Sequence, residues 1–181
     1  MMHDIYDMDL YKEAIKHISF DGKYKFHVAG SIYRGSTDPS DIDIIMVMDD
    51  DVVDSSSGTS SILRTLKSDL PMFVRRVGDR MVSFELILPG DKYYTPIQVW
   101  LSKRSEFPFM LLAWGAGTPY NVRLSRYAKL KGYILNQYGL YDIKTKKKVT
   151  DDTDRQRPIE FKTVADIQRF LGVTVRDISK L

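Results

Sequence analysis

The spacing of apolar residues predicts one helix followed by a series of short strands in the first half of the chain. Apolar side chains recur at helical intervals over residues 8–18, which indicates an amphipathic helix. Later segments are short, rich in β-branched and aromatic residues and bounded by turn residues, which favours strands. These segments cover residues 23–28, 42–48, 73–77, 81–88 and 96–101. The segment 42–48 is apolar on both faces, so we expect it to be a buried strand.

The remaining segments predict a loop and several helices. Residues 49–61 are rich in Asp and Ser, which predicts a loop, and residues 62–70 predict a short helix after it. The second half of the chain predicts helices over residues 107–114 and from residue 120 to a stop at Gly132, then short β segments within residues 133–149. A last helix is predicted from a capping-box-like start at Thr163 and Asp166 to Gly172.

This order of elements predicts an α+β fold, with a mixed β-sheet followed by a smaller C-terminal lobe. We expect one domain over residues 1–107 and a second over residues 108–181. Charge also divides the chain. Residues 1–101 carry 11 Lys and Arg against 16 Asp and Glu, whereas residues 102–149 carry 10 against 2. This asymmetry suits a protein that holds a phosphate backbone with one part and metal with another, although a solvated basic face explains the charge equally well.

Composition excludes several classes of protein. The chain has 181 residues, of which 43% are hydrophobic and 28% charged, as in ordinary globular proteins. It has no cysteine, which excludes disulfides and thiolate metal sites, and its three histidines lack zinc-ligand spacing. No apolar run is long enough for a membrane span, and the N-terminus lacks the apolar core of a signal peptide. We therefore expect a protein that is not secreted, acts in a cytoplasmic, nuclear or viral compartment, and is a monomer.

The most informative segment is a Gly-Ser pair followed by two aspartates. Gly30 and Ser31 precede Asp41 and Asp43, which begin the buried strand. Carboxylates two residues apart on a strand point to the same side and can share divalent ions. A Gly-Ser turn lets backbone N–H groups and a hydroxyl approach a triphosphate, and Arg34 adds a planar cationic donor. The pattern predicts metal-dependent phosphoryl transfer.

These residues and several later stretches resemble the DNA polymerase X family. The run from Gly30 to Gly35, with Asp41 and Asp43, is similar to the palm motif of that family. The stretch at residues 109–117 is similar to the family's "ALLGWTGS" junction, and residues 135–141 resemble its "LNEYGLY" stretch. The resemblance extends over essentially the whole chain. We expect the protein to lack the family's N-terminal lyase and fingers regions, so the chain most resembles a small viral polymerase X of palm and thumb only.

The resemblance implies a role for each matching residue. Gly30, Ser31 and Arg34 would contact the incoming triphosphate, and Asp41 and Asp43 would hold two Mg²⁺ or Mn²⁺ ions. Nucleoside triphosphates and a DNA primer-template or gapped duplex would be the partners. The nucleotide sugar and base would lie near Ala113, Trp114 and Asn121, although Trp114 also suits a core and Asn121 a helix cap. The basic lobe would hold duplex DNA, with these candidate residues: Arg123, Arg126, Lys129 and Lys131.

One departure from the family bears directly on activity. The family's third metal-binding aspartate falls on Gln98, which offers a neutral carbonyl oxygen but cannot carry charge. The protein is then weakly active or inactive, or another acid such as Glu85 substitutes, or the glutamine is an engineered change. The leading hypothesis is a nucleotidyltransferase that adds nucleotides to a DNA 3′ end in gap filling or repair. The alternatives are a catalytically silent DNA-end or nucleotide-binding protein and a transferase that modifies RNA, protein or a small molecule.

Overall fold

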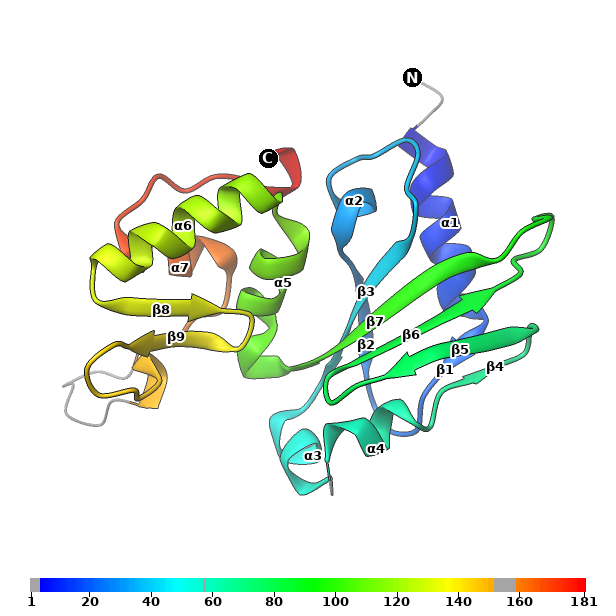
Figure 1. The fold of residues 1–181 in the computed structure, drawn as a ribbon, viewed down its shortest axis with the longest axis horizontal. Helices are drawn as coiled ribbons and strands as arrows, with labels where there is room; N and C mark the ends of the chain where they lie inside the picture. Colours follow the sequence, from blue (N-terminus) through cyan, green and yellow to red (C-terminus); the bar gives the residue numbers. More distant parts are fainter. Residues whose placement is uncertain (1–3, 57, 152–158) are drawn as a thin grey trace. The chain divides into compact units, whose positions relative to one another are not determined.

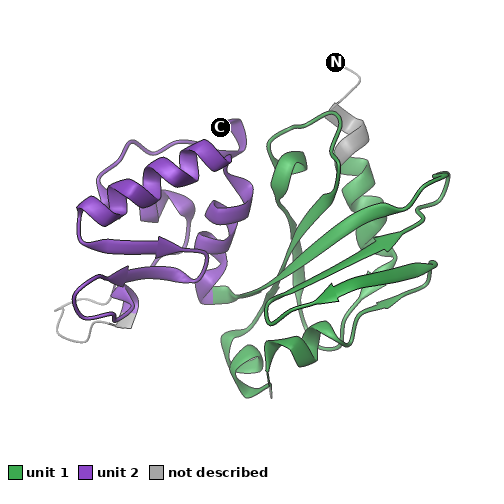
Figure 2. Ribbon diagram, viewed as in Figure 1, with its two compact units in different colours: residues 1–104 green, residues 105–181 purple. Residues whose placement is uncertain are grey.

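The chain divides into two compact units. A computed structural model describes residues 4–56, 58–151 and 159–181. The units cover Met1–Arg104 and Ser105–Leu181 (Figure 2). The sequence placed the domain boundary after residue 107, three residues later than the division between the units.

Unit 1 is built on a five-stranded sheet with the strand order β2-β3-β7-β6-β5 (Figure 1). These strands are β2 (Lys25–Val28), β3 (Ile42–Met48), β5 (Met72–Val77), β6 (Met81–Leu86) and β7 (Thr95–Lys103). The central pair β3 and β7 runs parallel, and every other pair in the sheet is antiparallel. The mixed sheet confirms the α+β prediction. Strand β3 has the predicted bounds.

The other elements of unit 1 are short, apart from the first helix. They are α1 (Asp4–Lys16), β1 (Ile18–Ser19), α2 (Gly30–Tyr33), α3 (Asp50–Ser55), α4 (Thr59–Leu63), β4 (Lys67–Ser68) and a 3₁₀ turn at Arg104–Glu106 that begins at the boundary. Strands β1 and β4 pair with each other in a separate two-stranded sheet. Helix α1 supplies Tyr11 and Ala14 to the core on one face of the large sheet. That core contains Ile42, Ile44 and Met46 of β3, so the residues between them face the other side.

Three predictions in unit 1 are wrong. The predicted loop at residues 49–61 contains two helices, α3 and α4, and the predicted helix at residues 62–70 ends at Leu63. Residues 67–68 form β4 because they pair with β1, a contact that no local pattern reveals. The first helix ends at Lys16, since Ile18 belongs to β1.

Unit 2 combines three helices with a two-stranded hairpin. Its elements are α5 (Phe107–Gly115), α6 (Thr118–Leu130), β8 (Tyr133–Asn136), β9 (Gly139–Asp142), α7 (Val164–Leu171) and 3₁₀ turns at Val149–Asp151 and Ile178–Lys180. Thr163 and Asp166 form the predicted capping box, and Gly172 ends α7 in a left-handed conformation. Phe109 and Phe161 pack edge to face with ring centres 5.2 Å apart, which ties α5 to the chain before α7.

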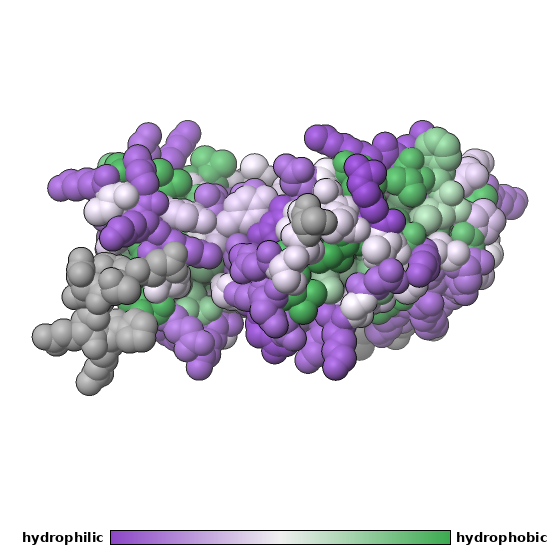
Figure 3. All heavy atoms as spheres, turned by 90° about the horizontal axis from the view of Figure 1, so that it is seen from below, coloured by the Kyte–Doolittle hydropathy of each residue, from purple (hydrophilic) through white to green (hydrophobic). Residues whose placement is uncertain are grey.

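The surface is polar on the face seen in Figure 3. Hydrophilic side chains cover most of that face, and hydrophobic ones form small patches between them. In the part of the chain that the structure describes, no helix is both long and apolar enough to cross a membrane.

Candidate active site

The predicted carboxylates lie together on the sheet face opposite the core of unit 1. Asp41 directly precedes β3 and Asp43 is its second residue. Gln98 on β7 lies opposite Asp43 in the parallel pairing, and its Nε2 donates a hydrogen bond of 3.0 Å to Oδ2 of Asp41. The structure therefore brings together the three positions that the sequence assigned to the catalytic acids.

The environment of Asp43 disfavours its charged form. The pKa of Asp43 is raised from 3.8 to about 6, chiefly by burial and then by the negative charge of Asp41. The neighbouring Trp100 side chain and the positive charge of Arg34 lower the pKa of Asp43 in part. A cation placed between the two carboxylates would remove the repulsion that opposes ionisation of Asp43.

Gly30 is required by its closeness to Asp43. Gly30 has a φ of +63°, and a Cβ built there would lie 2.9 Å from both Cβ and Cγ of Asp43. The backbone N–H of Ala29 donates to the carbonyl oxygen of Asp43 at 2.9 Å. The expected Gly-Ser turn is a single helical turn, α2, and its first residue packs against β3.

Ser31 and Arg34 lie at the two ends of the same turn. The Ser31 hydroxyl oxygen is buried and has no hydrogen-bond partner among the described residues. Arg34 is the C-terminal cap of α2 and is half-buried. Its charge lowers the pKa of Asp43, so the guanidinium lies within electrostatic reach of that carboxylate. An unpaired hydroxyl and a cation beside two acids form a set of groups that can bind an anion carrying a metal ion.

The donor set suits one divalent ion and lacks the third acid that a two-ion site needs. Two carboxylates and neutral oxygens are ligands that Mg²⁺ and Mn²⁺ accept. Within residues 4–56, 58–151 and 159–181, no cluster of three Asp, Glu, His or Cys side chains could hold a metal ion. Glu85 does not fill the gap, because its Oε2 accepts a 2.7 Å ion pair from Arg75.

Trp100 belongs to the site although the sequence did not identify it. It follows Gln98 by two residues on β7, so strand alternation places both side chains on one face. Its side chain lowers the pKa of Asp43, so the indole lies close to that carboxylate. The alternation along residues 97–101 was a signal that could have found it.

In unit 2, the predicted nucleotide-contacting residues lie around the end of α5. The indole Nε1 of Trp114 contacts Sδ of Met110 at 3.2 Å, and the side chain is half-buried. Asn121 Nδ2 donates to the carbonyl oxygens of Ala113 at 2.9 Å and Ala116 at 3.3 Å. Asn121 thus joins the last turn of α5 to α6, a local structural role in addition to any contact with a nucleotide.

The predicted DNA-binding residues lie on or just after α6. All four are exposed: Arg123, Arg126, Lys129 and Lys131. Within the described part of the chain none of them forms an ion pair, and Lys131 Nζ lies 5.1 Å from the ring centre of Tyr127. The lysines of residues 144–148 lie in a turn in which Asp142 Oδ1 accepts from two backbone N–H groups. Unit 2 therefore presents cations that acidic side chains do not neutralise.

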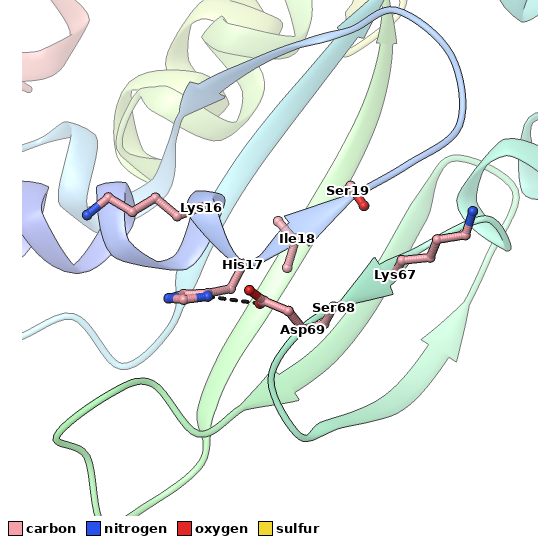
Figure 4. Close-up of a pocket in the computed structure, with 7 residues that line it drawn as sticks. All are labelled: Lys16, His17, Ile18, Ser19, Lys67, Ser68 and Asp69. Atoms are coloured by element: carbon pink, nitrogen blue, oxygen red, sulfur yellow. Dashed lines mark hydrogen bonds and ion pairs between the residues drawn. The ribbon is translucent and has the colours of Figure 1, made fainter.

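A separate pocket of about 350 Å³ lies where the end of α1 meets β1 and β4 (Figure 4). His17 in its wall contacts Asp69 at 2.9 Å and Glu13 at 3.1 Å. The hydrogen bonds to Glu13 and Asp69 raise the pKa of His17. None of the predicted site residues lines this pocket.

Comparison with known proteins identifies a relationship for unit 2. Residues 110–177, which are 68 of the 181 residues, match the family model of the DNA polymerase beta thumb. This match supports a relationship with the DNA polymerase beta-like proteins of family X. No curated protein matches the chain significantly.

Proposed function

We propose that this protein is a DNA polymerase beta-like nucleotidyltransferase that adds nucleotides to a DNA 3′ end, as in gap filling or repair. The observation that carries the proposal is the pair Asp41 and Asp43, set against Gly30 and Gln98 on one sheet face. The match of residues 110–177 to a DNA polymerase beta thumb supports DNA as the partner. It also makes transfer to RNA, protein or a small molecule less favoured.

The triphosphate would be held by the α2 turn. Ser31 has a buried hydroxyl without a partner, and a phosphate oxygen would accept its hydrogen bond. Arg34 would donate to the β- or γ-phosphate through its planar guanidinium. Gly30 and Arg34 of this turn lie close to Asp43, so the phosphates would approach the carboxylates only with a cation between them.

Asp41 and Asp43 would hold Mg²⁺ or Mn²⁺ bound to the triphosphate. When bound, such an ion neutralises phosphate charge and stabilises the developing transition state. Asp43 would bind in its ionised form, and a bound cation would lower its raised pKa. The Gln98 amide holds Asp41 in place, but it supplies no negative charge for a second ion.

Unit 2 would bind DNA through the exposed cations of α6. Arg123 and Arg126 have no acidic partner among the described residues and are free to contact phosphates. Trp114 and Ala113 would lie against the nucleotide sugar. The amide nitrogen of Asn121 already donates to two backbone carbonyls, so a contact with a base would use its Oδ1 atom.

A second candidate function is nucleotide and DNA binding without efficient transfer. The observation that favours it is the neutral Gln98 in the place of a third acid, together with Glu85 paired to Arg75. Such a protein would bind a triphosphate with one ion and a DNA end through unit 2. It would leave the primer hydroxyl without the metal that activates it.

The test combines nucleotide binding with primer extension in Mn²⁺, on the wild type, Gln98→Asp and the neutral control Gln98→Asn. The nucleotidyltransferase proposal expects triphosphate binding in all three proteins and the fastest extension in Gln98→Asp. Silent binding is supported if the wild type and Gln98→Asn bind but do not extend a primer. If Gln98→Asp folds, binds nucleotide and DNA and still transfers nothing, the polymerase proposal is wrong.

A further inference from the structure

Strand β5 at the edge of the large sheet exposes aromatic and basic side chains that the proposed reaction does not use. Phe73 is 52% exposed and Tyr94, just before β7, is 51% exposed. The Arg75 guanidinium lies over the Phe73 ring, 4.4 Å from its centre. The hydrogen bond with Glu85 raises the pKa of Arg75 most, and the electrostatic effect of Tyr94 adds to it. These residues, with Arg76, form what we call the edge platform.

The edge platform lies on the same sheet face as the candidate active site. Residues directly opposite each other on adjacent strands share a face. Asp43 lies opposite Gln98, and Gln98 lies opposite Ser83. Ser83 in turn lies opposite Arg76 on β5. Three strand spacings separate Arg76 from Asp43, which is about 14 Å across the sheet.

An irregularity in β5 turns both arginines toward this face. The pairing of β5 with β6 shifts between Val74 and Arg76, so Arg75 is an extra residue in the strand. A bulge of this kind re-aims side chains that would otherwise alternate between faces. Arg75 accordingly reaches both Glu85 and the Phe73 ring, while Arg76 forms no ion pair within the described residues.

A protein strand is a poor occupant for this edge. Bulges and charged side chains on an outer strand discourage the addition of another strand. The bulge and the charges do not explain why large aromatic rings stay exposed beside the arginines. Exposed rings interleaved with cations are the features with which proteins bind single-stranded nucleic acid, because bases stack on the rings and phosphates meet the charges.

We propose that the edge platform binds single-stranded DNA, with unpaired bases stacked on Phe73 and Tyr94 and the backbone held by Arg76. Arg75 covers one face of Phe73, so a base would stack on the other face. The Glu85 carboxylate competes with DNA phosphate for Arg75 and therefore weakens the site. Binding of this kind requires neither nucleotide transfer nor a metal ion.

The direct test is fluorescence anisotropy of labelled oligo-dT of roughly 12 nucleotides, in EDTA and without nucleoside triphosphates. Phe73→Ala and Tyr94→Ala should each weaken binding at least about fivefold, and Phe73→Trp should keep it because a ring remains. Val74→Ala is the matched control, since it removes an exposed apolar side chain from the same strand without removing a ring. Unchanged affinity in the double variant Phe73→Ala/Tyr94→Ala would overturn the inference.

Two further variants separate charge from stacking. Arg76→Ala should reduce the salt dependence of oligo-dT binding by about 0.7 in log–log slope, the contribution of one phosphate contact on a single strand. Glu85→Gln should strengthen binding, because it releases Arg75 for phosphate. A weaker affinity of Glu85→Gln for oligo-dT would contradict the competition between Glu85 and DNA phosphate for Arg75.

Failure here can be told apart from failure of the proposed function. The double variant Arg123→Ala/Arg126→Ala should weaken the binding of blunt duplex DNA. The edge-platform substitutions should still weaken oligo-dT binding by the same factor in that background. Loss of triphosphate binding in Asp43→Asn would support the active site, whether or not the edge-platform variants lose affinity for oligo-dT. If the wild type is a dimer that Phe73→Ala converts to a monomer, the edge is a self-association surface and the DNA inference is wrong.

Discussion

Replacing Asp43 with asparagine should stabilise the metal-free protein. The substitution removes a negative charge from a buried position and keeps the size of the side chain. In the folded state both burial and the nearby Asp41 oppose ionisation of Asp43. In the unfolded state neither applies, so the charge is more stable there than in the folded protein.

The size of the effect follows from the pKa of Asp43. Its rise from 3.8 to about 6 corresponds to about 3 kcal/mol at pH values above 6. Because the folded state holds the proton more tightly, the cost is absent below the unfolded pKa and grows as pH rises towards the folded pKa. About half of it is present at pH 5. Asp43 is only partly buried, so solvent screening reduces this figure, and we expect Asp43→Asn to gain about 1–3 kcal/mol at pH 7.5.

Urea unfolding in EDTA at pH 7.5 and pH 5 measures this gain. Trp100 fluorescence in a Trp114→Phe background reports on unit 1 alone. Adding Mn²⁺ should stabilise the wild type and leave Asp43→Asn unchanged. Lower stability of Asp43→Asn at pH 7.5, or an equal difference at both pH values, would refute the assigned electrostatics.

Three other outcomes are expected. Gly30→Ala should reduce the free energy of unfolding more than the control Gly35→Ala, because both glycines have positive φ but only a Cβ at Gly30 meets Asp43. Equal losses of stability in urea unfolding would contradict this. If half of the net charge of residues 102–149 contacts phosphate, the affinity for duplex DNA should fall with salt at a log–log slope of roughly −3 to −4. A slope near zero would mean that this surface does not bind DNA. If the enzyme is active, the small Ala113 should admit a ribose, and incorporation assays showing a preference for deoxynucleotides above roughly a thousandfold would disprove this.

Local patterns predicted the centre of unit 1 well and its margins poorly. Strand β3 was predicted with its observed bounds because it is apolar on both faces. Helix α3 was missed because its Asp and Ser residues were taken for a loop, although Asp50 and Asp51 in its first turn favour a helix start. Strand β4 could not be predicted, since only its pairing with β1 makes it a strand.

The part of the candidate site that lies on the strands could be predicted from the sequence. The positions of Asp41 and Asp43 followed from their spacing, that of Gln98 followed from the resemblance to family X, and the structure brings these side chains together. The closeness of Gly30 to Asp43 did not follow, because it depends on how the α2 turn packs on β3. The pairing of Glu85 with Arg75 depends on a bulge in β5, and no pattern in the sequence predicted that bulge.

The parallel pairing of β3 with β7 has a consequence for how the protein folds. More than 50 residues separate Ile42 from its partner Ile97, and the strands β5 and β6 lie between them in sequence. Contacts between such distant residues carry a large loop-closure entropy and slow folding. The hairpin of β5 and β6 closes locally and can form first. Asp41, Asp43 and Gln98 would then meet only in the last step, when the central strands of unit 1 join.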